Sequence, residues 1–526
     1  MIWVSETGVV LRDLVPAGLR REWVRCGHCP DRDLYSLFRE RVREHPLRAA
    51  VIDDEGALDY TTLDVVVREM AVRLAVAGCG SAEIVGVREP DGRDAVIAEL
   101  AILALGAVVL PLPRGADSLL DRAGVRFVVE SGRVSGSSKP GRVARVHPDA
   151  PARILVSSGS ESEPKMVAYS HNAFAGGRAN YVRAVHGETV VPRDLVLVSL
   201  TSGFGSFGVA VTLCRLGGTL ILTRRFDAGA ALRLISEHRP NHVFGVPAMW
   251  RRMVEHPSAT DTSGLAAIVS SGDTLPPSTR DACRRRFGVE MIDVYGSSDG
   301  VNCHTTTPEN GVGVPDPAVC EIRLVDGEIC ARGPMTPLCY VGAPELDAEY
   351  RLDGGWVRTG DNGRFDDQGR LHVTGRRKRV VIRGGYTISP AEVELALGDH
   401  PAISEVACVP VPDTVLGERL CACVSVRNGH SPGLPELVAF LAAKGLAVAK
   451  MPELLITLPE LPLGRTGKVC HRTLTEIAVS RPPEHACRPS DHECRPRSHA
   501  NPPERHSRPA VPVNGAVDPA AGDGQE

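Results

Sequence analysis

Hydrophobic and polar residues alternate with two different periods along the first quarter of the chain. Apolar residues at helical spacing take turns with short apolar runs that have the length of buried strands. We expect helices at 63–74 and 95–104 and strands at 83–87 and 108–112. Helices that alternate with apolar strands favour an α/β fold in which helices cover the sheets.

The same rhythm continues from residue 154 to residue 291. The expected strands cover 154–156, 196–200, 219–222, 242–245, 267–270 and 289–293. The expected helices begin at His171 and cover 208–216 and 230–237. From 320 to 374 the apolar runs shorten and turn sequences such as LDGGW and DDQGR crowd in, which predicts a small antiparallel sheet or barrel. An α+β pattern follows it.

Composition narrows the class of protein. The chain has 526 residues, of which 43% are hydrophobic, and a formal net charge of −4. This balance argues against a dedicated partner of nucleic acid or of an anionic membrane, because such proteins carry a basic surface. The longest apolar stretch, 95–112, contains Glu99, Gly106 and Pro111 and predicts a buried helix running into a strand, not a membrane span. We expect a cytoplasmic protein without a nucleic-acid or membrane partner.

Fifteen cysteines in 526 residues are too dilute for a disulfide scaffold, which favours a reducing compartment. Cys26 and Cys29 have the C-x-x-C spacing used in dithiol redox chemistry. That chemistry needs the pair at a helix N-terminus after a strand, where the thiol pKa falls. No apolar strand precedes Cys26, and Pro30 follows Cys29 before the expected helix at 33–40. We therefore expect plain structural cysteines in preference to a redox or zinc site.

Two segments that follow expected strands carry residues suited to a nucleotide. Residues 157–165, SSGSESEPK, form a hydroxyl-rich turn with a lysine, and such a turn can wrap phosphate oxygens with hydroxyl, N–H and ammonium groups. Residues 294–299, VYGSSD, combine an aromatic ring, a tight glycine turn, hydroxyls and a carboxylate, which can stack on a base and hold a metal ion. Each segment alone is more often an ordinary loop.

Two further segments lie later in the chain. Residues 356–361, WVRTGD, place Asp361 on an expected turn, where a carboxylate can accept two ribose hydroxyls. A basic run, a Gly-Gly turn and a helix start follow over 375–394. Residues 463–468, LGRTGK, present a glycine-flanked lysine, one of only six lysines among 60 basic residues. A lysine kept where arginine is the rule indicates a site that needs a compact ammonium.

In this order and spacing the four segments resemble those of the adenylate-forming superfamily, which includes acyl- and aryl-CoA synthetases, firefly luciferase and the adenylation domains of peptide synthetases. The resemblance covers residues 30–475. It implies an α/β fold with a large N-terminal domain over 1–376, built of two packed sheets with helices and a small β-barrel-like subdomain. A small mobile α+β domain would follow over 377–478. Residues 479–526, rich in proline, histidine and arginine, are expected to form a disordered tail.

The resemblance also implies the residues that bind ATP and magnesium. The implied ATP-binding residues are Ser157, Ser158, Gly159, Ser160, Lys165, Gly272, Asp273, Tyr295, Asp361 and Arg376. Tyr295 would stack on adenine, Asp361 would bind the ribose, and Asp299 would take the magnesium role of the family's glutamate. Glu161 and Ser162 depart from the family's Thr-Gly in the phosphate loop, where a carboxylate repels triphosphate unless it turns outward or magnesium bridges it.

The implied catalytic residues are Lys468, Ser298 and Lys378. Lys468 would bridge the acid's carboxylate and the ATP phosphate, Ser298 would reach the α-phosphate, and Lys378 would be the hinge of the small domain. Rotation about that hinge would withdraw Lys468 and present the CoA-binding residues Gly384 and Gly385 to a thiol. The implied reaction forms acyl-AMP with release of pyrophosphate and then a thioester.

The expected acid pocket follows the end of an expected strand. Its residues are Ser202, Phe204, Gly205, Phe244, Val246 and Gly296, and ordinary core packing is the alternative for the apolar ones. Amino-acid-activating members of the superfamily carry an aspartate where Gly205 stands. A buried ammonium without a partner is costly, so an α-amino acid is disfavoured. Aryl, alicyclic and medium-chain acids remain open.

The acyl acceptor is less constrained by the residues. No carrier-protein pattern follows residue 475, so we expect a free acceptor: coenzyme A first, a separate carrier protein of natural-product biosynthesis second, and an amine third. The competing class is a degenerate protein that only binds nucleotide, because three departures lie in the ATP site; the retained lysines, Asp361 and Arg376 speak against it. A luciferase-like oxygenase has no support beyond the shared adenylation site. The expected partners are a small carboxylic acid, ATP with Mg²⁺ and coenzyme A, in a monomer or homodimer.

Overall fold

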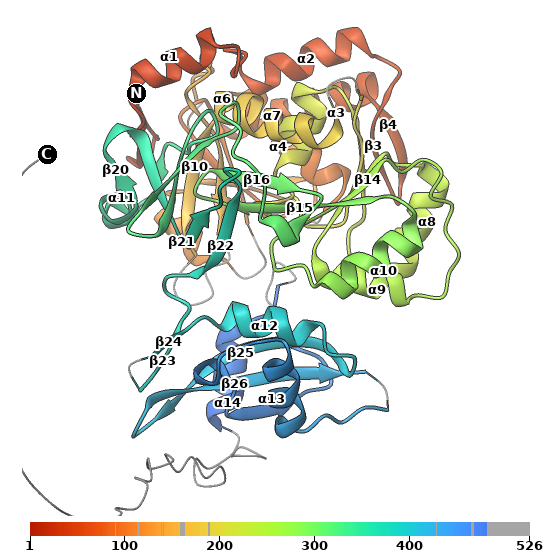
Figure 1. The fold of residues 1–526 in the computed structure, drawn as a ribbon. Coiled ribbons are helices and arrows are strands. Elements are labelled where there is room, and N and C mark those ends of the chain that lie inside the picture. The colour runs from red at the N-terminus through yellow and green to blue at the C-terminus, as the bar shows by residue number, and fades with distance from the viewer. Residues whose placement is uncertain are drawn as a thin grey trace, which may run out of the picture. The chain divides into compact units, whose positions relative to one another are not determined.

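The structure is a computed structural model that describes residues 1–480 apart from short gaps. The gaps are 90, 113–115, 138, 140, 158–163, 188–189, 385, 428 and 464–467. The expected tail lies outside the described residues from position 481 onward. The described strands form two large sheets, two smaller sheets and an N-terminal hairpin of β1 (Ile2–Val4) and β2 (Val10–Arg12) (Figure 1).

One large sheet has seven strands in the order β19-β10-β9-β6-β5-β7-β8. They are β5 (Ile84–Val87), β6 (Val108–Pro111), β7 (Phe127–Glu130), β8 (Arg133–Ser135), β9 (Pro151–Val156), β10 (Met166–Ser170) and β19 (Cys339–Tyr340), and α5 (Ser118–Arg122) precedes β7. The four central strands are parallel, and β8, β10 and β19 are antiparallel additions. The strands expected at 83–87, 108–112 and 154–156 are confirmed.

The second large sheet has eight strands in the order β16-β15-β14-β13-β11-β12-β3-β4. They are β3 (Ala49–Asp53), β4 (Gly56–Asp59), β11 (Arg193–Val196), β12 (Thr219–Leu222), β13 (His242–Gly245), β14 (Ala267–Ser271), β15 (Glu290–Ser297) and β16 (Val301–Thr305). Neighbours are parallel except at the edges, where β4 and β16 run antiparallel. The carboxyl ends of the parallel strands therefore share one edge, the side on which open α/β sheets bind ligands.

Helices fill the space between the two large sheets. They are α2 (Leu34–Glu44), α3 (Tyr60–Ala77), α4 (Arg93–Ala104), α6 (His171–Ala173) and α7 (Ala179–His186), with π-helical segments at Phe174–Arg178 and Gly208–Arg215. One hydrophobic cluster joins their buried side chains with Val85 of the first sheet and Leu222 of the second. The helices expected at 63–74 and 95–104 are confirmed as α3 and α4.

The other face of the eight-stranded sheet carries three helices. These are α8 (Ala228–His238), α9 (Pro247–Glu255) and α10 (Pro277–Phe287), which gather in one part of Figure 1. Trp250 and Phe287 pack edge to face, with ring centroids 6.2 Å apart, in the cluster that also contains Ile268 of β14. The eight-stranded sheet is therefore covered on both faces, as its near-continuous apolar strands require.

The strand expected at 196–200 is wrong, because β11 ends at the first of these residues. The backbone turns instead: Ser202 Oγ donates to the carbonyl of Ser199 over 2.7 Å, and Asp91 accepts the N–H of Leu200 over 2.8 Å. Hydroxyl and carboxylate side chains thus supply the bonds that a ladder would have supplied. The apolar run is buried as a loop, and a period alone cannot distinguish the two.

Two expected helices contain π-helical turns. The helix that begins at His171 passes through such a turn at Phe174–Arg178, and the helix expected at 208–216 is π-helical over Gly208–Arg215. Gly177 packs tightly in the first of these turns, where a Cβ atom would lie 2.2 Å from the backbone nitrogen of Met335. Widened turns of this kind are frequent at functional sites.

The antiparallel sheet expected over 320–374 is present. Its strands are β17 (Glu321–Val325), β18 (Glu328–Arg332), β20 (Arg351–Leu352), β21 (Trp356–Phe365) and β22 (Leu371–Arg376), all paired antiparallel. Helix α11 (Pro344–Tyr350) and 3₁₀ turns at Pro308–Asn310 and Asp353–Gly355 accompany it.

The smaller C-terminal domain has its own sheet and core. The strands are β23 (Val381–Arg383), β24 (Tyr386–Ile388), β25 (Ile403–Asp413), β26 (Gly417–Val426) and β27 (Leu454–Thr457), and the helices are α12 (Pro390–Gly398), α13 (Leu434–Ala443) and α14 (His471–Ser480), with a 3₁₀ turn at Val448–Lys450. Leu420 and Ala422 of β26 face the cluster with α12 and α13, whereas Cys421 and Cys423 face the cluster with α14. This two-residue period is what a strand between two helical layers requires.

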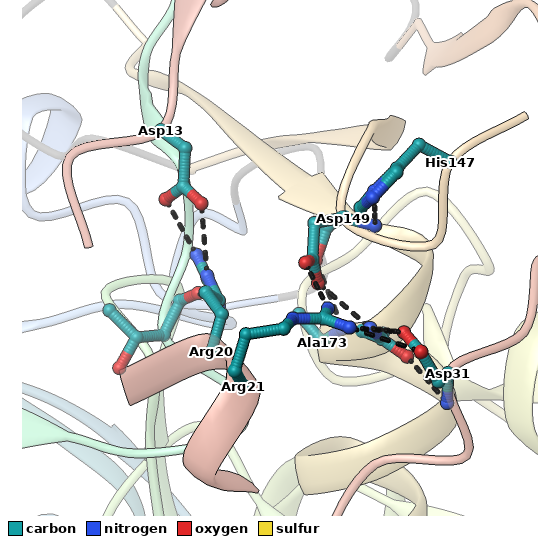
Figure 2. A network of polar contacts seen from close by, with 10 residues as sticks. Asp13, Arg20, Arg21, Asp31, His147, Asp149 and Ala173 are labelled. Carbon is teal, nitrogen blue, oxygen red and sulfur yellow. Dashed lines mark hydrogen bonds and ion pairs between the residues drawn. The ribbon is translucent and has the colours of Figure 1, made fainter. Parts of the chain in front are cut away.

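Ion pairs tie the N-terminal helix α1 (Ala17–Arg25) to the rest of the domain (Figure 2). Arg20 forms an ion pair with Asp13 over 2.9 Å, and both side chains are almost inaccessible. Arg21 bridges two carboxylates, Asp31 at 2.9 Å and Asp149. Asn172 at the start of α6 donates to the same Asp149 over 2.8 Å. The entry of α6, which follows β10, is thereby anchored from three sides.

Two structural findings concern the helices and the C-x-x-C cysteines. Among the helices that the structure describes, none has the length and apolar character needed to cross a membrane. Cys26 is exposed and Cys29 is buried, and both thiols are free. Burial raises the pKa of Cys29 to about 12. A thiol with a raised pKa is a poor nucleophile, which agrees with the expectation of structural cysteines.

Candidate active site

Three residues from separate segments meet at one carboxylate. Asp361 of β21 pairs in register with Arg376 of β22, and the Arg376 Nε lies 3.1 Å from Asp361 Oδ1. Tyr295 of β15 donates its hydroxyl hydrogen to Asp361 Oδ2 over 2.8 Å. Burial raises the pKa of the Asp361 carboxyl, and the neighbouring Arg376 and Tyr295 act in the opposite direction. The structure thus brings together the residues expected at the base and the ribose.

The expected turn at Asp361 is wrong, because the residue lies inside β21. Gly360 immediately before it has φ +76°, and the register of the β21–β22 pair shifts just after it. This local irregularity permits a carboxylate to project from the middle of a strand. Glycine and aspartate are typical of turns, which is why the local sequence predicted one here.

The expected magnesium carboxylate, Asp299, is held by hydroxyl groups. Tyr340 of β19 donates to Oδ1 over 2.5 Å, and Ser297 Oγ donates to Oδ2 over 2.7 Å. Each oxygen keeps a second lone pair for a cation. Among the described residues there is no cluster of three metal-binding side chains. A single carboxylate that shares the ion with substrate phosphates and water is nevertheless how Mg²⁺ is commonly bound, so the donor set fits magnesium.

Ser298, expected to reach the α-phosphate, is fixed through its backbone. Its carbonyl accepts the hydroxyl hydrogen of Tyr169 over 2.7 Å, and Tyr169 lies on β10. Tyr169 and Tyr340 therefore hold residues 297–299 from the neighbouring sheet. Sequence analysis missed both tyrosines, because a tyrosine within an apolar strand looks like ordinary core.

Two expected lysines flank one aromatic ring. Lys165 Nζ lies 3.6 Å from the centroid of Tyr350, and Lys378 Nζ lies 5.6 Å from the same centroid. Lys378 also donates to Glu349 over 3.0 Å, and that contact raises its pKa. The phosphate-loop lysine and the expected hinge lysine are thus neighbours, with α11 between them.

The base of the expected phosphate loop is closed by reciprocal hydrogen bonds. The N–H of Ser157 donates to the Lys165 carbonyl over 2.8 Å, and the N–H of Lys165 donates to Ser157 Oγ over 3.1 Å. Ser158, Gly159 and Ser160, like the departing pair Glu161 and Ser162, lie outside the described residues.

Lys468 lies among charged residues of the large domain. Gly272 has φ +94°, and a Cβ atom there would lie 3.1 Å from Lys468 Cε, so the two residues are close neighbours. Burial lowers the pKa of the Lys468 ammonium, Asp273 and Asp361 act to raise it, and Arg376 acts to lower it. The ammonium therefore lies within electrostatic reach of the site built around Asp361.

A cleft of the structure borders this lysine and reaches one residue of the expected acid pocket, Val246. It is lined by residues that include Val246, Asp273, Glu394, Lys468 and His471. His471, which sequence analysis missed, has its pKa lowered to about 3, first by burial and then by Arg379 and Arg376. It therefore stays neutral and adds no positive charge to the cleft at physiological pH.

The two phenylalanines of the expected acid pocket pack together with Phe207 in the hydrophobic core. Phe204 and Phe244 meet edge to face with ring centroids 6.0 Å apart, and Phe207 lies 4.5 Å from Phe244. Ser202 Oγ accepts the N–H of Gly205 over 2.9 Å, so its hydroxyl is engaged within its own loop. A Cβ atom on Gly205 would lie 2.3 Å from the carbonyl oxygen of Ser199.

Two expected glycines have different surroundings. A Cβ on Gly296 would lie 2.4 Å from Asn302 Nδ2, so a larger residue beside Tyr295 would displace the Asn302 side chain. Gly384 follows β23 with φ +54°, and its N–H donates to the Leu416 carbonyl over 2.8 Å. In the described part of the chain Gly384 does not line the cleft around Lys468. Its neighbour Gly385 lies outside the described residues.

The chain is similar to known proteins over most of its length. The AMP-binding enzyme family matches residues 38–136 and 114–341, and the AMP-binding enzyme C-terminal domain matches 392–468. Triostin synthetase I of Streptomyces triostinicus is 30% identical over 521 residues, which cover 88% of this chain and 98% of the relative. The medium-chain fatty-acid–CoA ligase of Escherichia coli is 26% identical over 533 residues, covering 87% and 92%.

A solved structure extends the likeness to three dimensions. The amide bond synthetase McbA from Marinactinospora thermotolerans superposes with a TM-score of 0.72 at 27% sequence identity. The match covers 84% of this chain and 99% of that chain.

Proposed function

Because the chain belongs to the AMP-binding enzyme family of adenylate-forming ligases, we propose that it is an acid–thiol ligase, an AMP-forming acyl-CoA synthetase. It activates a carboxylic acid as acyl-AMP with release of pyrophosphate and transfers the acyl group to the thiol of coenzyme A. The observation that carries the proposal is the convergence of Lys468 on the Tyr295–Asp361–Arg376 cluster.

The first half-reaction joins two anions, and the proposed roles follow from that. A carboxylate attacks the α-phosphate poorly unless the phosphate charge is neutralised and the reactants are held in line. Lys468 bridges the carboxylate and the phosphate, and Ser298 contacts the α-phosphate. Asp361 accepts the ribose hydroxyls once the Tyr295 hydroxyl yields to them. Magnesium, which Asp299 would hold, offsets phosphate charge when bound.

The second half-reaction needs a different set of residues around acyl-AMP, which is a mixed anhydride. We propose that the chain passes from the large to the small domain after Arg376 and that Lys378 is the hinge. Rotation there withdraws Lys468 and brings the turn at Gly384 and Gly385 to the acyl-AMP. Acyl-AMP has a good leaving group, so the thiol needs approach and alignment more than added charge.

The acid is apolar at its far end in this proposal. Phe204, Phe244 and Val246 offer an aromatic and aliphatic lining, which suits aryl, alicyclic or medium-chain acids. The tight approach of Gly205 to Ser199 leaves no space for the aspartate that would hold an ammonium. This contact supports the exclusion of α-amino acids.

Coenzyme A is the proposed acceptor, and the similarity to a fatty-acid–CoA ligase supports it. The alternative is a separate carrier protein in natural-product biosynthesis. The similarity to an amide bond synthetase gives a specific reason to test an amine as well. We also propose a cytoplasmic monomer or homodimer; the free cysteines of the described residues fit a reducing compartment.

Pyrophosphate release tests the proposal. Purified protein with ATP and Mg²⁺ is assayed against benzoate, salicylate, cyclohexanecarboxylate and octanoate, with and without coenzyme A, beside Lys468→Ala. We expect acid-dependent release that coenzyme A accelerates and that the substitution lowers about 10²–10³-fold. Thioester formation from preformed acyl-AMP should change much less in the variant. Equal loss in both half-reactions would refute the role of Lys468, and stimulation by a carrier protein or an amine instead of coenzyme A would replace the acceptor.

A further inference from the structure

A buried ion pair lies beneath the loop that carries the proposed acid pocket. Arg153 of β9 is 1% exposed and forms an ion pair with Glu99 of α4, which is 4% exposed. The other terminal nitrogen of Arg153, Nη2, donates to the backbone carbonyl of Leu200.

The opposite side of the same residue is held by a second charged side chain. Asp91 accepts the N–H of Leu200 over 2.8 Å and the hydroxyl hydrogen of Ser199 over 3.1 Å. The backbone N–H and carbonyl of Leu200 are thus bound by side chains of opposite charge from two other segments. This arrangement, which we call the Leu200 clamp, consists of Asp91, Arg153 and Glu99.

The clamp holds a loop that has no strand ladder to fix it. Residues 199–206 follow the end of β11, and Ser202 Oγ links Ser199 to Gly205 through bonds of 2.7 and 2.9 Å. Phe204, the ring that meets Phe244, lies within this turn. A shift of Leu200 would therefore displace Phe204 relative to Phe244.

The loop borders a small cavity, so its position depends on the contacts of the clamp. One small cavity is lined by Asp91, Glu99, Arg153, Leu200 and Thr201, among others. A loop above a cavity can sink into it when the contacts that suspend it are removed. A buried ion pair contributes little net stability compared with apolar residues of the same shape. We therefore ascribe to this pair the positioning of Leu200.

We propose that Asp91 and Arg153 are positioning residues that set the acid pocket by fixing both backbone groups of Leu200, with Glu99 as the counter-charge of Arg153. The inference rests on the proposed function, because it assigns the acid pocket to residues 199–206. It deepens that function by naming what shapes the pocket.

Two substitutions at Asp91 separate the effect of losing its hydrogen-bond acceptor from the effect of losing its negative charge. Asp91→Ala removes the acceptor, whereas Asp91→Asn keeps an oxygen for the Leu200 N–H. We expect the alanine variant to raise KM for the best acid of the panel about tenfold while KM for ATP stays within about twofold. The asparagine variant should recover most of the loss. An equal effect of both variants, or an effect on ATP alone, would overturn the inference.

The role of Arg153 is tested by replacing it together with Glu99, so that neither buried charge is left without its partner. Arg153→Met combined with Glu99→Leu removes both partners at once, which folded proteins tolerate better than the loss of one. The matched control is Arg20→Met combined with Asp13→Leu, which removes an equally buried pair away from the loop. We expect a raised acid KM only in the first double variant; the same rise in both would refute a positioning role.

Hydrogen exchange provides a readout that does not depend on turnover. Amide exchange of the peptide spanning 197–207 should be faster in Asp91→Ala and in the Arg153/Glu99 double variant than in the wild type and in the control. Unchanged protection would overturn the clamp whatever the kinetics show. If no acid supports pyrophosphate release by the wild type, the proposed function fails, and faster exchange would still support the clamp as the support of this loop.

Discussion

Tyr340 donates a hydrogen bond of 2.5 Å to the carboxylate of Asp299, and both residues are buried. Tyr340 lies on β19, an edge strand of the seven-stranded sheet, whereas Asp299 follows β15 of the eight-stranded sheet. The bond therefore fixes the proposed magnesium ligand across the two large sheets. A hydrogen bond to a charged acceptor is stronger and more directional than a neutral one, so Asp299 has one preferred orientation.

Tyr340→Phe should weaken the response to magnesium. Without the hydroxyl, Asp299 loses the donor that orients it, and the loss of a hydrogen bond to a metal-binding side chain typically costs about 10–100-fold in metal affinity. We expect the Mg²⁺ concentration for half-maximal pyrophosphate release to rise about tenfold. Tyr60→Phe is the matched control, since it removes a buried tyrosine hydroxyl that donates to the carbonyls of Leu213 and Gly218 instead of Asp299. An unchanged magnesium requirement in Tyr340→Phe would contradict the assignment.

Two neighbouring glycines should respond differently to alanine. A Cβ on Gly205 would lie 2.3 Å from the Ser199 carbonyl oxygen, whereas a Cβ on Gly203 meets nothing within 4 Å. We expect Gly205→Ala to displace the loop and raise the acid KM at least about tenfold, with Gly203→Ala close to the wild type. Steady-state kinetics with the best acid decide the matter. Comparable kinetics in the two variants would show that the pocket does not depend on this contact.

The alkaline limb of the pH–rate profile should belong to Lys468. Burial lowers the pKa of its ammonium, which Asp273 and Asp361 oppose only in part. The protonated form is the one that neutralises phosphate, so adenylation should fall as the pH rises through that lowered pKa. The fall then begins at a lower pH than for an exposed lysine. Lys468→Arg should be slower but lose this limb; a limb that persists in the variant belongs to another group.

A buried histidine should make stability depend on pH. His186 places Nε2 2.7 Å from Asp194 Oδ1 and Nδ1 2.8 Å from the Val182 carbonyl, so both nitrogens face acceptors and the imidazolium form satisfies both. Burial disfavours the charge, but Asp194 outweighs it, and the pKa of His186 is raised. His242, whose ring centroid lies 3.9 Å away, has its pKa lowered to about 4 by burial and by His186, and stays neutral.

The sign of that dependence follows from the raised pKa. The pair contributes its full stability below the usual histidine pKa of about 6.5 and loses it as the pH rises through the raised value. We expect the melting temperature of the wild type to fall by a few degrees more than that of His186→Gln over this rise. His45→Gln, at a half-exposed position, serves as the control. Parallel curves for wild type and His186→Gln would refute a charged His186.

The predicted strands matched the structure where turn-forming residues bound an apolar run. The strands at Thr219–Leu222 and His242–Gly245 have the bounds that were expected, because each is a fully buried run, with Gly218 before the first and Pro247 shortly after the second. The run at 196–200 has similar composition but ends as a loop, because Asp91 and Ser202 offer its backbone other partners. The partner Asp91 lies more than a hundred residues away in sequence, so no local window contains it.

The sequence by itself determined the α/β fold, because the periods of apolar residues indicate alternating helices and strands. It also determined the family and most of the residues proposed for the nucleotide and the acid, because these lie in short motifs that follow one another in a characteristic order. Only the tertiary structure decided how they are held. Tyr340 on Asp299, Tyr169 on the Ser298 carbonyl, and Arg153 on Leu200 are contacts between segments that are distant in the chain. Each depends on how sheets and loops come together in space, and a hydrogen bond between distant segments leaves no mark on the periodicity or composition of either one.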